Sequence, residues 1–272
     1  MLSPARALSL NAEAGRELPR VPALAALYAR GCRPRHGEVI MVAGRSGTQK
    51  SGFALWWTCQ MNLKTLYLSA DMSAFTASAR IASMMTGLTT DGVEAQMHKG
   101  GDAKADVLDS MKDLNLTFSF GPITWPGVDA EIEAYVELHN AYPEMIVLDN
   151  LMDVEGAASD YAVQMDVMQN VTDLSRATGA AILVMHHSSD KSWDARTDPW
   201  SPPSRDQIKN GMSEKPELTL SVALNPRSHE FRIAILKQRM GFSDPTASSY
   251  ASLKCDPERT RFEPWGQTLT TI

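Results

Sequence analysis

Eight residues near the start of the chain decide its fold: Gly44-Arg45-Ser46-Gly47-Thr48-Gln49-Lys50-Ser51. They follow an apolar run at residues 39–43 and precede a helical run that begins near Gly52. A strand, a loop of small residues ending in Lys-Ser and a helix start bring loop amides, a helix dipole and a lysine to one anion. The stretch predicts a phosphate-binding loop for a nucleoside triphosphate. The alternative is an ordinary strand-to-helix turn.

One residue departs from the usual phosphate-loop pattern, G-x-x-x-x-G-K-[ST]. The pattern has glycine directly before the lysine, and this chain has Gln49 there. Glycine allows backbone conformations and a close phosphate approach that a side chain obstructs. We therefore expect Gln49 to reduce nucleotide affinity or hydrolysis.

Length and composition indicate one large α/β domain. The chain has 272 residues, of which 43% are hydrophobic, so it buries roughly three quarters of its unfolded surface. We predict an N-terminal arm at residues 1–36 and the α/β domain at residues 37–272. Its three cysteines, Cys32, Cys59 and Cys255, have no spacing typical of zinc or redox sites, which indicates free thiols.

Charge and hydropathy limit the partners. No apolar run is long enough to span a bilayer, and charged residues interrupt the first twenty positions, so we expect a cytoplasmic protein with no membrane partner. The formal net charge is -6. Because this charge does not attract nucleic acid, any DNA binding must come from a local cluster of Lys and Arg.

Strand-like and helix-like runs alternate after the phosphate loop. Four short apolar runs lie at residues 65–69, 116–120, 145–148 and 181–185. Three helix-length segments lie between them, at residues 73–86, 128–140 and 161–178. This alternation predicts a mostly parallel central sheet flanked by helices on both faces.

The pattern changes after Met185. Residues 188–210 form a polar, proline-containing stretch that is too long for an ordinary connection, and such loops are usually functional or mobile. Four further strand-like runs follow, at residues 217–224, 230–236, 250–254 and 260–263. They predict antiparallel strands added to the edge of the sheet.

Two aspartates end predicted strands. Asp149 follows an apolar strand, and phosphate-loop enzymes place such an acid in the magnesium shell. Asp71 ends the strand after the phosphate loop, where a base would orient the attacking water. Each also has a structural alternative, because Asp149 is suited to a turn and either Asp71 or Ser73 is suited to capping the next helix.

Two further pairs carry chemistry. His186 and His187 end another predicted strand, where one of them would contact the γ-phosphate; a metal site is the weaker alternative, because no matching Cys or His cluster occurs elsewhere. Lys237 and Arg239 follow a later apolar strand. Their simplest role is a solvated strand end, whereas in ring ATPases an arginine from the neighbouring subunit stabilises the transferring phosphoryl group.

The order of these segments resembles the RecA-like ATPase core of the DnaB-type replicative DNA helicases. The resemblance covers residues 36–265 and rests on five segments: GEVIMVAGRSGTQKSGFAL, TLYLSADMSAFTASARIASMMTG, MIVLDNLMDV, AILVMHHSS and RIAILKQRMGFSDP with TRFEP. The His-His pair followed by Lys191 is also similar to the RepA-like hexameric helicases of plasmids. The lack of the larger helicases' N-terminal domain resembles the short phage and plasmid versions.

This resemblance implies a role for each matching residue. Lys50 and Ser51 would bind ATP phosphates and Mg²⁺, with Asp149 as the second-motif aspartate. Asp71 would match the catalytic carboxylate, usually glutamate, and His187 the γ-phosphate sensor. Lys237 and Arg239 would match the pair that acts on the neighbouring subunit's nucleotide. Asp in place of Glu shortens the base by one methylene, which would weaken hydrolysis.

The resemblance also implies a homo-oligomeric, hexameric ring around single-stranded DNA. The family's DNA contacts come from loops that face the central channel, and the loop at residues 188–210 offers cations for phosphates and tryptophans for base stacking. The alternative is a solvated surface loop. The candidate phosphate ligands are Lys191, Arg196, Arg205 and Lys209.

Three functions fit these observations. The leading hypothesis is an ATP-hydrolysing, ring-forming motor on single-stranded DNA, of phage or plasmid type and acting in the host cytoplasm. The second is a RecA-like recombination or annealing ATPase that forms a DNA filament without unwinding. The third is a nucleotide-binding assembly protein with weak turnover, for which Gln49 would mark a lost motor function.

Overall fold

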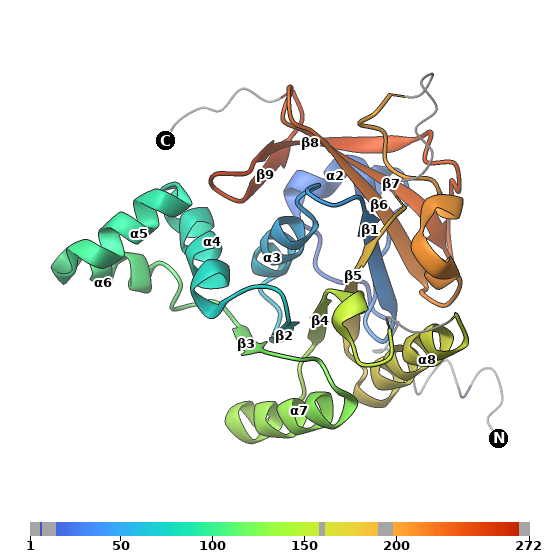
Figure 1. Ribbon diagram of the computed structural model, residues 1–272, viewed down its shortest axis with the longest axis horizontal. Coiled ribbons are helices and arrows are strands. Elements are labelled where there is room, and N and C mark those ends of the chain that lie inside the picture. The colour runs from blue at the N-terminus through green and yellow to red at the C-terminus, as the bar shows by residue number, and fades with distance from the viewer. Residues whose placement is uncertain (1–5, 7–14, 158–160, 190–197, 267–272) are drawn as a thin grey trace.

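The computed structural model describes residue 6 and residues 15–157, 161–189 and 198–266 (Figure 1). Its strands are β1 (Val39–Gly44), β2 (Thr65–Ser69), β3 (Leu116–Phe120), β4 (Met145–Asp149), β5 (Ala181–His187), β6 (Leu218–Asn225), β7 (Glu230–Gln238), β8 (Tyr250–Asp256) and β9 (Arg261–Pro264). Its α-helices are α2 (Ala25–Ala29), α3 (Lys50–Met61), α4 (Ala74–Thr86), α5 (Thr90–Lys99), α6 (Gly101–Asp109), α7 (Trp125–His139) and α8 (Tyr161–Thr178). Short 3₁₀ turns are η1 (Pro22–Leu24), η2 (Leu151–Asp153), η3 (Arg205–Gln207) and η4 (Lys209–Glu214).

All nine strands belong to one sheet, in the order β3-β2-β4-β5-β1-β6-β7-β8-β9. Neighbours from β3 to β6 pair in parallel, and β6 to β9 pair antiparallel. The predicted fold class, a mostly parallel sheet with antiparallel edge strands, is confirmed. Because these neighbours are parallel, the carboxyl ends of β1, β2, β4 and β5 lie together, and α/β proteins bind their ligands at such ends. We call this side of the sheet the phosphate-loop edge, and the side where these strands begin the opposite edge.

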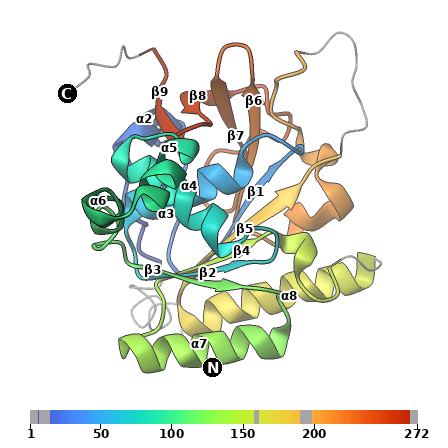
Figure 2. The same ribbon diagram turned by 60° about the vertical axis from the view of Figure 1, so that its left-hand side comes forward.

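Helices cover both faces of the sheet (Figure 2). Alternate residues of β1 enter different cores: Ile40 and Val42 join one cluster, and Met41 joins the other. The first cluster lies under α3 and the start of the chain, and the second lies under α7 and α8. Because both faces are buried, β1 is a continuous apolar run rather than an alternating one.

Helices α5 and α6 form a lobe with α4 that projects beside β3 (Figure 1). No helix is predicted from the sequence for this segment, because its two helices carry few apolar residues. Val93 and Val107 are the buried members of α5 and α6, and they pack on Ala79 and Ala82 of α4. The Thr89 hydroxyl caps α5 by accepting a hydrogen bond from the Gly92 amide at 3.1 Å.

The described part of the N-terminal arm packs on the chain's own core. Leu18, Val21, Leu24 and Leu27 are at most 3% exposed and belong to the cluster under α3. Burying such side chains contributes about 1.5–3 kcal/mol each. The boundary proposed at residue 36 therefore separates chain segments that share a core. Within the described residues, no helix is long and apolar enough to cross a membrane.

Candidate nucleotide site

The phosphate loop lies between the end of β1 and the start of α3. Lys50 is 8% exposed, and its Nζ donates hydrogen bonds to the carbonyl oxygens of Gly44 at 3.0 Å and Arg45 at 2.8 Å. A Cβ on Gly44 would lie 2.7 Å from the Val222 carbonyl oxygen, so the turn requires glycine there. The loop is therefore folded around its lysine.

Gln49 occupies the backbone conformation that the missing glycine would favour. Its φ and ψ are 61° and 30°, in the left-handed region, and it is the N-cap of α3. Its side-chain oxygen lies against Gly52, where an added Cβ would come within 2.8 Å of it. The loop thus keeps its shape without the usual glycine, at a backbone cost of about 1–2 kcal/mol.

Ser51 and Asp149 meet beside the loop, as predicted for a magnesium shell. The Ser51 hydroxyl donates to Asp149 Oδ1 at 2.9 Å, and the Tyr67 hydroxyl donates to Oδ2 at 2.8 Å. Asp149 is 3% exposed. Burial raises its pKa, while the hydrogen bonds from Tyr67 and Ser51 lower it. Two oxygen groups held side by side suit Mg²⁺, which uses few protein ligands and keeps phosphates and water for the rest.

Asp71 lies at the rim of the same pocket. It is exposed, and its Oδ2 accepts a hydrogen bond from Asn150 Nδ2 at 3.2 Å. The Ser73 hydroxyl caps α4 by accepting from the Thr76 amide at 3.1 Å. Ser73 therefore does the capping that the sequence left open between Ser73 and Asp71.

His186 and His187 diverge at the end of β5. His187 lines the pocket of the phosphate loop, whereas His186 is fully buried and its Nε2 lies 3.1 Å from the Lys209 carbonyl oxygen. Burial lowers the pKa of His186 to about 4, so its ring is neutral near pH 7. The pair therefore divides between the site and the core, and His187 alone keeps its predicted place.

Several residues of this site were missed from the sequence, among them Arg80, Tyr67 and Asn150, the partner of Asp71. Arg80 of α4 lines the pocket and makes one described hydrogen bond, to the Met72 sulfur at 3.4 Å. Tyr67 holds Asp149, as described above. The signal for Arg80 was its position on the helix that follows Asp71, whereas Tyr67 had no signal without the pairing of β2 with β4. The full lining is Ser46, Gly47, Thr48, Gln49, Lys50, Ser51, Gly52, Asp71, Arg80, Asp149, Asn150 and His187.

Lys237 and Arg239 lie at the opposite edge of the sheet. The Arg239 amide donates to the Glu217 carbonyl at 2.9 Å, and the Glu217 amide donates to Val39 at the start of β1, whereas the phosphate loop follows the end of β1. Arg239 is 57% exposed, with one nitrogen 3.5 Å from Glu217 Oε1. Lys237 Nζ donates to the carbonyl oxygens of residues 213 and 214. This pair is therefore remote from its own chain's phosphate loop.

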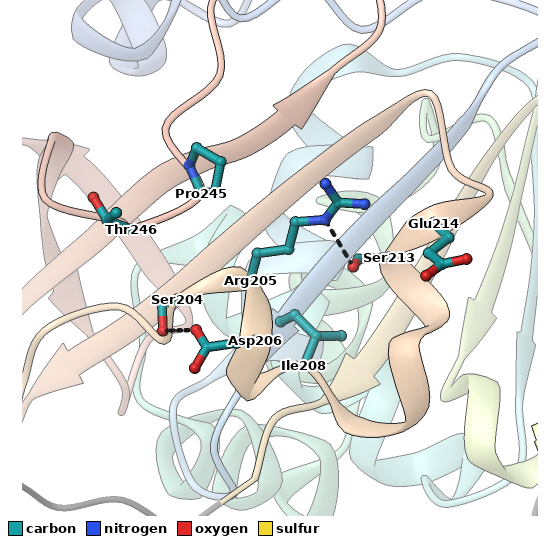
Figure 3. Close-up of a pocket in the computed structure, with 8 residues that line it drawn as sticks. All are labelled: Ser204, Arg205, Asp206, Ile208, Ser213, Glu214, Pro245 and Thr246. Carbon is teal, nitrogen blue, oxygen red and sulfur yellow. Dashed lines mark hydrogen bonds between the residues drawn. The ribbon is translucent and has the colours of Figure 1, made fainter.

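The candidate DNA ligands fall into two groups. Lys191 and Arg196 lie outside the described residues, and Lys209 is exposed. Arg205 lines a cavity of about 710 Å³, larger than the phosphate-loop pocket, and its Nε donates to the Ser213 hydroxyl at 3.3 Å (Figure 3). The chemistry nevertheless places the nucleotide in the smaller pocket, because the larger one has no phosphate loop. Arg205 and Lys209 stay predictions as DNA ligands.

Residues 3–192, more than half of the chain, match the protein family described as AAA domain (AAA_25). The chain belongs to the AAA domain family. This AAA domain is 28% identical over 265 residues to the gene 65 protein of Mycobacterium phage L5, covering 93% of the chain and 95% of that protein. It is 26% identical over 233 residues to the gene 65 protein of Mycobacterium phage D29, covering 79% and 94%.

Two solved structures share the fold of this AAA domain. One, described as an ATPase domain, superposes with a TM-score of 0.74 at 12% identity, covering 94% of both chains. The other, a DnaB-like replicative helicase solved with its primase interactions, superposes with a TM-score of 0.75 at 12% identity, covering 95% of this chain and 65% of that one. The family makes the chain a nucleotide-binding ATPase. Its fold is the RecA-like fold of DnaB-like helicase ATPase domains, as the sequence resemblance implied.

Proposed function

We propose that the protein is an ATP-hydrolysing motor that forms a ring and moves on single-stranded DNA. One observation carries this proposal: the phosphate loop and the Lys237–Arg239 pair lie at opposite edges of the same sheet. Arg239 of one chain therefore cannot reach that chain's own nucleotide. It completes a site when a second copy places its phosphate-loop edge against it.

The phosphate-loop edge supplies binding and activation. Lys50 and the loop amides would hold the β- and γ-phosphates, and Ser51 with Asp149 would hold Mg²⁺. The metal ion, when bound, neutralises charge on the phosphates. Asp71 takes a proton from the attacking water, with Asn150 fixing the orientation of its carboxylate. Arg80 adds a second cation to the pocket.

The opposite edge supplies charge stabilisation to the next subunit. An arginine finger provided in trans contributes about 10³ to 10⁵ in rate. Only the arginine end of the ion pair between Arg239 and Glu217 is exposed, at 57%, but the two charged atoms lie 3.5 Å apart and water screens the guanidinium, so Arg239 exchanges this contact for a phosphate. Lys237, anchored through two backbone carbonyls, supports the same position.

His187 links the nucleotide to the loop at residues 188–210. It lines the pocket at the end of β5, and Ser188, the next residue, pairs with Ile208 in a short bridge. Loss of the γ-phosphate would change the contacts of His187 and reposition that loop. Lys191, Arg196, Arg205 and Lys209 are the DNA phosphate ligands proposed on it. The phage relatives support an activity in the host cytoplasm.

Steady-state ATP hydrolysis with and without single-stranded DNA tests this function. We expect DNA to stimulate hydrolysis in the intact protein, more weakly as salt rises because phosphate contacts release counterions. Lys50→Ala should abolish both basal and stimulated hydrolysis, whereas Lys64→Ala, which changes an exposed lysine before β2, should not. Hydrolysis that ignores DNA would reject the motor. Strand displacement that requires ATP then separates a helicase from a RecA-like filament.

Gln49 favours a second candidate, a nucleotide-gated assembly protein with weak turnover. Its side chain lines the pocket and its backbone carries the strain of a left-handed conformation. For this candidate, Lys50→Ala changes the assembly state, measured by sedimentation, while the intact protein shows no hydrolysis for the substitution to remove.

A further inference from the structure

The residues after β7 form a projecting turn with two large apolar side chains in solvent. We call residues 239–242 the tip: it carries Arg239 together with Met240, 66% exposed, and Phe242, 56% exposed. Both apolar residues flank Gly241, so the turn presents them within a few residues of the cation. Exposed apolar groups gathered beside a functional charge mark an interaction surface.

Hydrogen bonds made by Gln238, the residue before the tip, hold the turn in place. Gln238 Nε2 donates to the carbonyl oxygens of Gly31 at 2.9 Å and Met240 at 3.1 Å, and its Oε1 accepts from the Arg33 amide at 2.9 Å. The Gln238 amide also donates to the Ser243 hydroxyl at 2.8 Å. A turn fixed in this way loses little conformational entropy when it binds, which favours affinity.

The chain beyond the tip is anchored too. Asp244 accepts hydrogen bonds from the Thr246 amide at 3.0 Å and the Ser249 amide at 2.7 Å. The Arg205 amide donates to the Pro245 carbonyl at 2.8 Å, and Figure 3 shows Arg205 reaching from this point to Ser213. Burial lowers the pKa of Lys237 most, and the nearby charges of Arg205 and Arg239 lower it further. These three cations therefore lie on one side of the molecule.

Charge decides which surface the tip contacts. Arg239 is the exposed charge of the tip, because its partner Glu217 is nearly buried, so a two-fold contact between two tips would bring two guanidinium groups together and is unfavourable. The phosphate-loop pocket holds Asp71 and Asp149 together with Lys50 and Arg80, so its own charges roughly cancel, and a bound triphosphate makes it negative. A head-to-tail contact between the two edges of successive copies is therefore electrostatically complementary.

The phosphate-loop edge also offers an apolar partner. Phe75, on the first turn of α4 and four residues beyond Asp71, is 54% exposed. It leads into an apolar groove between α4, α5 and α6 that is also lined by Val93, Met97 and Leu108, the last being 48% exposed. The acid and the aromatic group on this edge match the cation and the aromatic group on the tip.

We propose that the tip of one copy packs Met240 and Phe242 against Phe75 and the α4–α5–α6 groove of the next copy, with Arg239 directed at the adjacent nucleotide site. This inference rests on the proposed function for the role of Arg239, and it assigns the apolar anchor of the interface. Aromatic anchors of this kind dominate binding energy at protein interfaces.

Cysteine cross-linking tests the contact directly. The three native cysteines are buried, and burial raises the pKa of each thiol to about 12, so they react poorly. In a chain carrying both Phe242→Cys and Phe75→Cys, a bismaleimide should give a ladder of covalent oligomers on denaturing gels. The matched control carries Phe242→Cys with Leu138→Cys, since Leu138 is 71% exposed but lies on α7. It should give no ladder.

A second variant measures the energy of the contact. Phe242→Ser should raise the concentration for half-assembly by about tenfold or more in sedimentation experiments, because it removes an interface anchor. Its circular dichroism should be unchanged, since Phe242 is outside the core. An unchanged assembly midpoint, or an oligomer that forms no ladder, would overturn the inference.

These outcomes separate the contact from the motor. DNA-stimulated hydrolysis without a ladder means that the proposed function holds and the tip contact is wrong. A ladder without DNA-stimulated hydrolysis means that the contact is right and the motor is wrong. A protein that stays monomeric at every concentration with ATP and DNA contradicts both.

Discussion

The two edges of the sheet differ in how their charged groups are held. At the phosphate-loop edge, Lys50 and Asp149 are nearly buried, and each has at least two hydrogen-bond partners. At the opposite edge, Arg239 is 57% exposed and touches one carboxylate at 3.5 Å. The first edge is a finished half-site, whereas the second presents its cation to solvent.

This difference shows where preorganisation is needed. A site that binds phosphate and metal must hold its ligands in place before the substrate arrives, because reorganising them would lower affinity and rate. A finger that acts on another subunit must instead release its resting contact and form a new one. A long ion pair whose cation is mostly exposed suits that task, whereas a pair with both partners buried would hinder it.

Among the substitutions that test this comparison, Arg239→Ala should have the largest effect. Removing the trans-acting guanidinium should lower kcat by about 10³ while leaving ATP binding within a few-fold, because the phosphate loop of the same chain is untouched. ATP binding is measured by titration calorimetry and kcat by steady-state hydrolysis. Glu217→Gln is the matched control, since it removes the resting partner of Arg239 and keeps the guanidinium.

Mixing two inactive variants sharpens the result. Each active interface needs Lys50 from one copy and Arg239 from the next, so an equal mixture of Lys50→Ala and Arg239→Ala chains should contain intact interfaces, about a quarter of the total. Hydrolysis should therefore reappear on mixing. If the mixture stays inactive while its chains co-assemble, Arg239 does not act between subunits.

A smaller effect is expected from Tyr67→Phe, which tests how firmly the first edge is built. Tyr67 is fully buried, and its hydroxyl fixes one oxygen of Asp149 while Ser51 fixes the other. Losing a group that orients a metal ligand costs about 10- to 100-fold in metal affinity. We expect the Mg²⁺ concentration for half-maximal hydrolysis to rise about tenfold, with Mn²⁺ binding, measured by electron paramagnetic resonance, weakened to match.

Tyr135→Phe controls for loss of a buried tyrosine hydroxyl. Tyr135 is 3% exposed on α7, and its ring centre lies 4.2 Å from the ring centre of His139 at a tilted angle of 40°, away from the phosphate loop. It should leave the Mg²⁺ dependence unchanged. Equal effects of the two substitutions would mean that Tyr67 contributes packing rather than orientation.

The sequence predicted one edge better than the other. The phosphate loop, the parallel strands and Asp149 follow from local patterns. Apolar strands buried on both faces and a Lys-Ser loop can be recognised from contiguous residues, without knowing which strands pair. Tyr67 was missed because its partner depends on β2 lying next to β4, a pairing between strands far apart in sequence. The weakly apolar α5 and α6 were missed because only Val93 and Val107 mark their buried side.

The opposite edge was predicted only through resemblance. Periodicity identifies β7 as a strand but does not show that its end lies away from the phosphate loop; the antiparallel pairing of β6 and β7 decides that. The resting contact of Arg239 with Glu217 depends on this register. The roles assigned to Asp71, His187, Lys237 and Arg239 stay predictions until the substitutions are measured.

The smallest expected effect comes from Gln49→Gly, which tests whether the backbone conformation of residue 49 limits the affinity of the phosphate loop for ATP. Gln49 has a φ of 61°, a conformation that glycine adopts without strain. We expect the substitution to tighten ATP binding by a few-fold, because glycine lets the loop backbone close further on the phosphates, whereas a residue with a Cβ is confined near its present conformation.

Gln49→Ala distinguishes backbone strain from side-chain obstruction. Alanine keeps the Cβ and so the left-handed strain, but it removes the carboxamide that lies against Gly52. If strain limits binding, glycine improves ATP affinity and alanine does not; if obstruction limits it, both do so equally. Weaker binding in both variants would instead make the Gln49 carboxamide a nucleotide ligand. In that case the departure from the glycine pattern is an addition to the phosphate-loop edge rather than a loss.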